Sequence, residues 1–297
     1  MSLTTTQLSA LSRLFSASVL REMAKKGYSP LFTRLLVDTD LLALTSVAMI
    51  GDVKTVYEAA FSVLSQLGWR DEYVYRAALT HKVLLGVHSL NTASMLTEFR
   101  VGASRADVVI LNGTSTVYEI KSERDSLARL ASQLINYRKV FAKIYVIAAE
   151  SHVQDVLENV STDIGVLSLG RRGQISTRRK TIERPDLVCP VTIFESIRSA
   201  EAATILQSLK IPVPGVPNTV LHGAMRECFA RLDPETVHQQ MVQTLKNTRK
   251  LVPLKSLMDQ MPQSLKPAVL AMNFRRSDHR RLISAINTPL VQALNWA

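Results

Sequence analysis

The chain has 297 residues, with 36 Lys and Arg against 25 Asp and Glu, which gives a formal net charge of +11. Hydrophobic residues make up 46% and charged residues 21%, a globular composition that excludes a disordered or collagen-like chain. No stretch approaches the roughly 18 consecutive apolar residues of a membrane helix, and the first residues do not resemble a signal peptide. The positive charge makes a polyanion the first partner to consider.

The two cysteines of the sequence, Cys189 and Cys228, are too few for a disulfide framework and lack the spacing of metal ligands. We therefore expect reduced thiols in a cytoplasmic protein with no membrane partner.

The N-terminal part of the chain predicts helices. Apolar residues recur at three- and four-residue spacing over residues 7–86. Gly27 is placed to end the first helix, and Asp52 and Asp71 are placed to cap later ones. From Leu96 the pattern changes to short runs suited to strands.

The middle of the chain predicts a sheet. Asn112-Gly113 is a hairpin signal between two such runs. The predicted strands cover residues 96–101, 106–111, 116–121, 144–149, 165–169 and 174–177. Helical spacing separates the third and fourth strands, and a strand–helix–strand order favours a mixed sheet. The predicted fold class is α/β (α+β), with a mixed central sheet flanked by helices and with helical N- and C-terminal regions.

Proline is unevenly distributed. Apart from Pro30, every proline lies at or after Pro185, and such a stretch predicts a linker because proline disrupts helix interiors and central strands. Helical spacing returns after it. The predicted organisation is a helical region over 1–88, a sheet core over 89–184, a Pro-rich linker over 185–219 and a helical region over 220–297.

Three charged residues in the predicted strands indicate chemistry. Alternation places Glu119 and Lys121 on one face of their strand. Adjacent strands are about 4.8 Å apart, so the hairpin brings Asp107 beside Glu119. Two facing carboxylates need a compensating cation, and Mg²⁺ is a hard ion that prefers such oxygen ligands. We expect Lys121 to point at the space where a metal-bound water and a scissile phosphate would meet.

The run Ser104-Arg105-Ala106-Asp107 followed by Glu119-Ile120-Lys121 resembles the PD-(D/E)XK nuclease superfamily, which has the restriction-endonuclease-like fold. Ala106 stands where the strict motif has proline. The resemblance implies that Asp107, Glu119 and the Ile120 backbone carbonyl bind Mg²⁺, with Mn²⁺ as a substitute. It also implies that Lys121 orients or helps to deprotonate the water that hydrolyses a phosphodiester. It covers roughly residues 90–180 and extends, less specifically, to uncharacterised bacterial proteins that join this core to helical flanks.

Two further features resemble the same superfamily. Glu98 occupies the place of an additional acidic residue, which implies a further metal ligand. Gln133 and Tyr137 are four residues apart and share a helix face, like the glutamine–tyrosine motif beside the catalytic residues of exonuclease-like branches. Each feature alone is ordinary in a globular protein, and their combination is what predicts a site.

Basic residues predict a nucleic-acid-binding surface. Few acidic residues lie near the basic cluster of the predicted last hairpin, so a solvated face and a surface that tracks phosphates both stay open. Arg105 lies beside Asp107, so contact with a phosphate and pairing with a carboxylate both stay open for it. The basic groups at 246–250 and 275–281 could extend the surface. The candidate residues are Arg105, Arg171, Arg172, Arg178, Arg179 and Lys180.

The sequence therefore predicts a metal-dependent nuclease that hydrolyses phosphodiester bonds in DNA. One alternative is a catalytically silent nucleic-acid- or protein-binding module of the same fold, with a protein partner on its helical flanks. Another is a nuclease that acts on RNA, although the chain lacks an aromatic-rich platform for single strands.

Overall fold

The computed structural model describes residues 3–45 and 50–296, and the chain divides into two compact units. Unit 1 comprises Met1–His81, Ser122–Arg124 and Pro253–Ala297, and unit 2 comprises Lys82–Lys121 and Asp125–Val252. Residues 46–49, which fall in the stretch predicted to be helical, lie outside the described residues.

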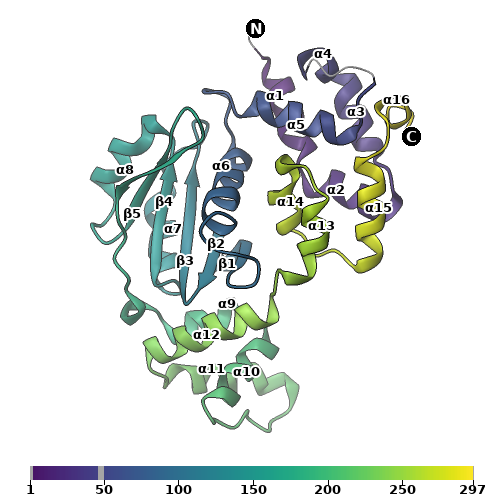
Figure 1. The fold of residues 1–297 in the computed structure, drawn as a ribbon. Helices are drawn as coiled ribbons and strands as arrows, with labels where there is room; N and C mark the ends of the chain where they lie inside the picture. Colours follow the sequence, from purple (N-terminus) through teal and green to yellow (C-terminus); the bar gives the residue numbers. More distant parts are fainter. Residues whose placement is uncertain (1–2, 46–49, 297) are drawn as a thin grey trace. The chain divides into compact units, whose positions relative to one another are not determined.

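Unit 1 is helical in its described part (Figure 1). Its first helices are α1 (Thr5–Leu14), α2 (Ala17–Lys26), α3 (Pro30–Asp38), α4 (Leu41–Thr45), α5 (Val53–Leu64) and α6 (Glu72–Leu79). Its later helices are α13 (Lys255–Asp259), α14 (Lys266–Leu270), α15 (Arg276–Ile286) and α16 (Leu290–Ala293). Helix α1 packs on α3 and α5, and α2 packs on α15, so the beginning and the end of the sequence share one core.

The helix boundaries in unit 1 follow the predicted caps, with one difference. Asp52 and Asp71 each accept a hydrogen bond from the backbone N–H three residues later, at 3.0 and 3.3 Å. Gly27 ends α2 with a φ of +87°. The first predicted helix is instead two helices, because Ser16 adopts extended backbone and begins α2. The apolar spacing continues across this break and does not reveal it.

Unit 2 contains a six-stranded sheet in the order β1-β2-β3-β4-β5-β6. The strands are β1 (Ser94–Val101), β2 (Ser104–Asn112), β3 (Thr114–Lys121), β4 (Lys143–Ala148), β5 (Gly165–Leu169) and β6 (Ile175–Arg179). Strands β3, β4 and β5 are parallel to one another, and the other neighbours are antiparallel. Gly113 makes the predicted turn between β2 and β3 with a φ of +72°. The predicted mixed sheet with flanking helices is confirmed.

The helices of unit 2 pack on this sheet or on each other. They are α7 (Leu130–Arg138), α8 (Val153–Asn159), α9 (Pro190–Ser196), α10 (Ser199–Ser208), α11 (Asn218–Ala230) and α12 (Pro234–Thr248). Helix α7 packs on β2 and β4, α9 on β1, and α12 on β2 and β3. Single π or 3₁₀ turns lie at Thr80–Leu84, Glu150–His152, Pro185–Leu187, Val252–Leu254 and Gln263–Leu265.

The compact units do not follow the predicted domain boundaries. The predicted linker over 185–219 contains α9 and α10, whose Ile193, Phe194 and Ile205 are buried in the core of unit 2. Pro190 is the first residue of α9. Proline fits this position because the backbone N–H that it lacks would not take part in a hydrogen bond within the helix. The predicted C-terminal region is also divided, because α11 and α12 belong to unit 2.

A buried ion pair joins α10 to the end of α12. Glu201 is 2% exposed and accepts hydrogen bonds from Arg249 Nε and Nη2 at 2.8 and 2.7 Å. Thr248 Oγ1 and the Arg198 backbone N–H donate to the same carboxylate at 3.0 and 2.9 Å. The guanidinium also lies over the ring of Phe99 on β1, 5.5 Å from its centroid. The carboxylate therefore has a charged partner and two neutral donors in place of water.

Gly165, the first residue of β5, leaves room for an aromatic side chain. An added Cβ would lie 2.2 Å from the ring of Tyr145 and 2.8 Å from the Thr181 backbone nitrogen. The Tyr145 ring stacks on the Tyr118 ring, with their centroids 5.6 Å apart. Since both rings and the backbone are fixed by the sheet, a methyl group here has no space.

We expect Gly165→Ala to lower the free energy of unfolding by about 1–3 kcal/mol, because it overpacks the sheet. Urea denaturation measures this loss. Gly223→Ala in α11 is the matched control, since nothing lies within 4 Å of its added Cβ; there alanine should raise stability by up to about 1 kcal/mol through its helix propensity. Equal effects of the two substitutions would contradict the prediction.

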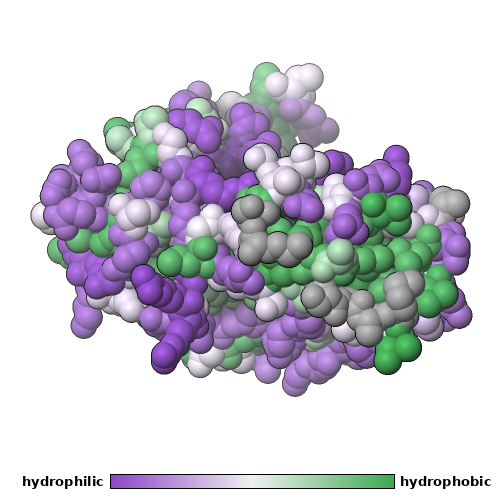
Figure 2. Space-filling view, turned by 90° about the horizontal axis from the view of Figure 1, so that it is seen from above, coloured by the Kyte–Doolittle hydropathy of each residue, from purple (hydrophilic) through white to green (hydrophobic). Residues whose placement is uncertain are grey.

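Apolar side chains of unit 1 gather on the side of α3 and α16, which is green in Figure 2. The exposed large apolar residues of these helices are Val37 and Val291, at 60% and 53% exposure.

Both cysteines of the chain are free. None of the helices in the described part is long and apolar enough to span a membrane.

Candidate active site

Glu98 on β1 and Asp107 on β2 face each other in the sheet. The paired residues on either side of them are Thr97 with Val108 and Phe99 with Ala106. One carboxylate oxygen of Glu98 lies within 4.8 Å of one of Asp107. Glu98 also has a φ of +54°, in the left-handed region that residues other than glycine rarely adopt. Such strain is typical of functional sites and requires the surrounding structure to hold it.

The Asp107 carboxylate takes the place of a backbone acceptor at the point where the pairing between β2 and β3 ends. The last pair on this side is Val108 with Tyr118, so Asp107 and Glu119 are the next residues in register. The pairing of β3 with β4 continues to Lys121. Asp107 Oδ2 accepts a hydrogen bond from the Ile120 N–H at 2.7 Å, which satisfies a backbone donor at the end of the ladder.

Three acidic residues thus occupy one row across β1, β2 and β3. Their exposure increases along the row, from the buried Glu119 through the half-buried Asp107 to the exposed Glu98. The row therefore reaches the surface of unit 2 at β1.

Glu119 and Lys121 form an ion pair on one face of β3, as the alternation predicts. Lys121 Nζ donates to Glu119 Oε1 at 2.7 Å and to Gln133 Oε1 on α7 at 3.0 Å. The side chains of the pair are 2% and 6% exposed, so Lys121 is enclosed rather than directed at open space. Burial raises the pKa of Glu119, and the charge of Lys121 opposes that rise.

Tyr137 on α7 completes the cluster. Its hydroxyl lies 2.7 Å from Glu119 Oε2 and 2.6 Å from the Arg105 carbonyl oxygen, and it can donate its proton to either. Burial, reinforced by the Glu119 carboxylate, raises the pKa of Tyr137, so the phenol stays neutral. The preceding residue, Asn136, donates to Ser104 Oγ at 2.8 Å. Two consecutive residues of α7 therefore hold the start of β2.

The structure brings together most of the residues that the sequence predicts for the site. Hydrogen bonds link Asp107 to β3, and they connect Glu119, Lys121, Gln133 and Tyr137. Ile120 enters through its N–H, and a role for its carbonyl stays a prediction. Sequence reasoning missed Asn136 and its contact with Ser104, which depends on how α7 lies on β2 and has no signature in the spacing.

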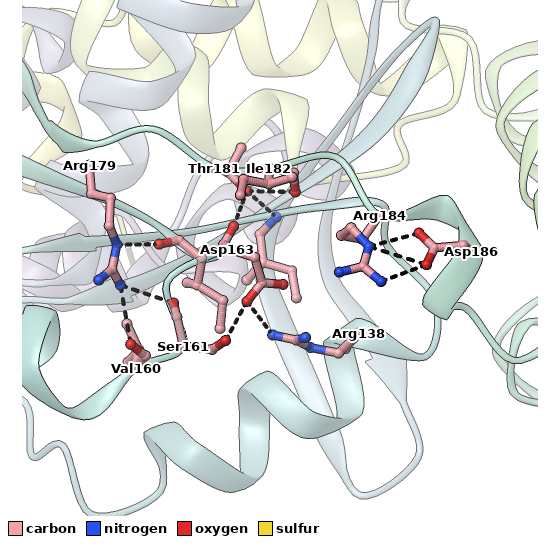
Figure 3. Close-up of polar contacts among 11 residues, drawn as sticks. Arg138, Val160, Ser161, Asp163, Arg179, Thr181, Ile182, Arg184 and Asp186 are labelled. Atoms are coloured by element: carbon pink, nitrogen blue, oxygen red, sulfur yellow. Dashed lines mark hydrogen bonds and ion pairs between the residues drawn. The ribbon is translucent and has the colours of Figure 1, made fainter.

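The predicted nucleic-acid-binding residues of the β5–β6 hairpin have different environments. Figure 3 shows Arg179 directed at the segment that follows α8, where its guanidinium donates to backbone carbonyls. The acceptors are Leu157, Val160, Ser161 and Ile164, at 2.9–3.3 Å. These contacts assign Arg179 a structural role in unit 2.

Two other predicted basic residues have acidic neighbours in the structure. Arg178 donates to Ser168 Oγ at 3.0 Å and forms an ion pair with Glu150. Arg105 lies 3.9 Å from a carboxylate oxygen of Glu98, and both side chains are exposed. At the tip and end of the hairpin, Arg171, Arg172 and Lys180 are exposed.

A family model described as bacteriophage P4 protein cII matches residues 65–258, more than half of the chain. The chain belongs to this family. The matched segment includes every residue of the predicted active site.

Protein cII of Enterobacteria phage P4 is 35% identical to this chain over 97 residues, which are 32% of the chain. The match spans 36%, about a third, of that relative's length. A solved protein of unknown function from Silicibacter pomeroyi shares 19% identity and a TM-score of 0.31, over 49% of this chain and 93% of its own. None of these names states an activity.

Proposed function

We propose that the protein is a metal-dependent nuclease that hydrolyses phosphodiester bonds in DNA. The observation that carries the proposal is that Glu98, Asp107 and Glu119 occupy one row across β1, β2 and β3, with Lys121 bonded to Glu119. Such a set of residues matches the PD-(D/E)XK pattern described above.

The donor set suits a hard divalent cation. Carboxylate oxygens are the ligands that Mg²⁺ prefers, and it commonly uses only one or two of them. Asp107 and Glu98 bring oxygens within 4.8 Å of each other, and Asp107 is held in place by the Ile120 N–H. In this proposal Asp107 and Glu119 hold Mg²⁺ or Mn²⁺, and Glu98 contributes from the exposed end of the row.

The ion would lower the pKa of a bound water and stabilise negative charge on the phosphate. Lys121, which is buried beside Glu119 in the free protein, is proposed to orient the attacking water and take part in its deprotonation once the metal and DNA are bound. Gln133 fixes the position of the Lys121 ammonium. Tyr137 fixes the Glu119 carboxylate and, through the Arg105 carbonyl, the start of β2.

The net charge of +11 supports a polyanionic substrate. Arg171, Arg172 and Lys180 at the β5–β6 hairpin are proposed to contact phosphates of the DNA backbone. The two free cysteines support a cytoplasmic location.

The test is incubation of the purified protein with plasmid and linear DNA in Mg²⁺, in Mn²⁺ or in EDTA. We expect loss of substrate with either metal and none in EDTA. Binding of DNA without cleavage in any metal would overturn the nuclease and favour a silent binding module. Cleavage of RNA alone would assign the activity to the other nucleic acid.

A further inference from the structure

Unit 1 carries a basic surface that the proposed active site does not use. It is formed by the exposed faces of α2 and α15, which pack on each other (Figure 1). We name it the α2–α15 surface. Its exposed basic residues are Arg21, Lys25, Lys26, Arg275, Arg276 and Arg280.

Arg281 joins α15 to α2 by a hydrogen bond. Its Nε donates to the Ala24 carbonyl oxygen of α2 at 2.8 Å. Lys25 and Arg280 directly follow and precede these two bonded residues in the sequence. The two helices are therefore held against each other next to Lys25 and Arg280.

The acidic residues of both helices are already engaged. Glu22 is the single acidic residue of α2, and its Oε2 accepts from Ser29 Oγ at 2.7 Å and from the Leu31 N–H at 3.3 Å. Asp278 is the single acidic residue of α15; it caps the helix at the Arg275 N–H and pairs with Arg281. Neither carboxylate is left to neutralise the exposed cations.

The placement of charge on α15 opposes helix electrostatics. Lys25 and Lys26 lie in the last turn of α2, where the helix dipole favours cations. Arg275 and Arg276 lie at the start of α15, where the dipole disfavours them. Helix stability therefore accounts for the lysines of α2 but not for the arginines of α15, which points to an external anion.

We propose that the α2–α15 surface binds the phosphate backbone of duplex DNA, as a second contact separate from the active site. The chemistry required is a row of exposed cations that neutralises successive phosphates. A membrane surface fits less well, because none of the exposed large apolar residues in the described part lies within α2 or α15 to insert into lipid. The choice of DNA as the ligand rests on the proposed function.

The test compares two triple variants of the full chain with equal net charge. One is Lys25→Gln, Arg276→Gln and Arg280→Gln in the α2–α15 surface. The control is Arg13→Gln, Arg34→Gln and Lys255→Gln, three exposed basic residues elsewhere in unit 1. Fluorescence anisotropy with a labelled duplex in EDTA measures binding at several salt concentrations, and circular dichroism checks folding.

We expect the surface variant to bind at least about 10-fold more weakly at 0.1 M salt, and the slope of log K against log salt to fall by about 3, one for each lost phosphate contact. The control variant should stay within about 3-fold of the parent. Equal losses of DNA affinity in both variants would overturn the proposal, because they would show that binding depends on net charge and not on this surface. Loss of binding to anionic phospholipid vesicles with DNA binding unchanged would assign the surface to a membrane.

The same measurement tests the α2–α15 surface independently of the proposed nuclease activity. Binding in EDTA requires no catalysis, so the comparison is valid even if no DNA is cleaved. If the protein is a nuclease, the surface variant should cleave at near the parental rate once DNA is saturating, because its active site is intact.

Discussion

Lys121→Ala is expected to lower the rate of DNA hydrolysis by about 10²–10⁴-fold, the range typical for loss of a positioned acid–base group. The substitution removes the ammonium that donates to Glu119 and Gln133. DNA binding in EDTA should change little, because Lys121 is 5% exposed and does not present its charge at the surface. Cleavage at saturating DNA and Mg²⁺, with binding measured in parallel, checks both statements.

Two further variants make the result interpretable. Lys121→Met keeps most of the buried stem and should lose as much activity, which separates loss of the charge from loss of packing. Lys143→Ala removes a lysine of β4 whose partner is Glu183, at 2.9 Å, and it should cleave at the parental rate. A Lys121 variant that cuts as fast as the parent would refute the role assigned to this residue.

Glu201→Ala is expected to cost about 3–5 kcal/mol of the free energy of unfolding, because it leaves Arg249 without its buried partner. Thr248 and the Arg198 N–H lose their acceptor in the same step. Chemical denaturation followed by circular dichroism measures the loss. Glu195→Ala is the matched control, since its ion pair with Arg226 is exposed on both sides and should be worth at most about 1 kcal/mol.

The Glu201 ion pair also predicts how stability depends on pH. Burial acts to raise the pKa of Glu201, but the hydrogen bonds and charge of its donors outweigh burial, so the pKa lies below its ordinary value of 4.5. A carboxyl with a lowered pKa stabilises the fold above 4.5 and loses that contribution as the pH falls through the lowered value. The parent should therefore lose more stability than Glu201→Ala on acidification from neutral pH. Parallel pH profiles would contradict this account.

The sequence predicts elements whose signals are local. Asp52, Asp71 and Gly27 mark helix ends, and Gly113 marks the hairpin, because each acts on backbone groups a few residues away. The assembly of distant segments has no such signal. Prolines at helix starts resemble a linker in the sequence, and only packing shows that α9 and α10 are part of a core.

The candidate site divides in the same way. Alternation along β3 predicts the common face of Glu119 and Lys121, and the hairpin register predicts that Asp107 lies next to them. The enclosure of Lys121 depends on the position of α7 over the sheet, which sequence spacing does not determine. For Arg179, the positive charge alone predicts a phosphate contact, whereas its carbonyl acceptors belong to another segment and have no signal in the sequence.

The pairing of α2 with α15 has a consequence for synthesis. Residues 27–275 are translated between these two helices, and the whole of unit 2 lies within that interval. Unit 2 can complete its core while the ribosome is still extending the polypeptide, whereas the face of α2 that packs on α15 stays uncovered until α15 is made. During that delay the nascent N-terminal segment is the part of the molecule most in need of a chaperone.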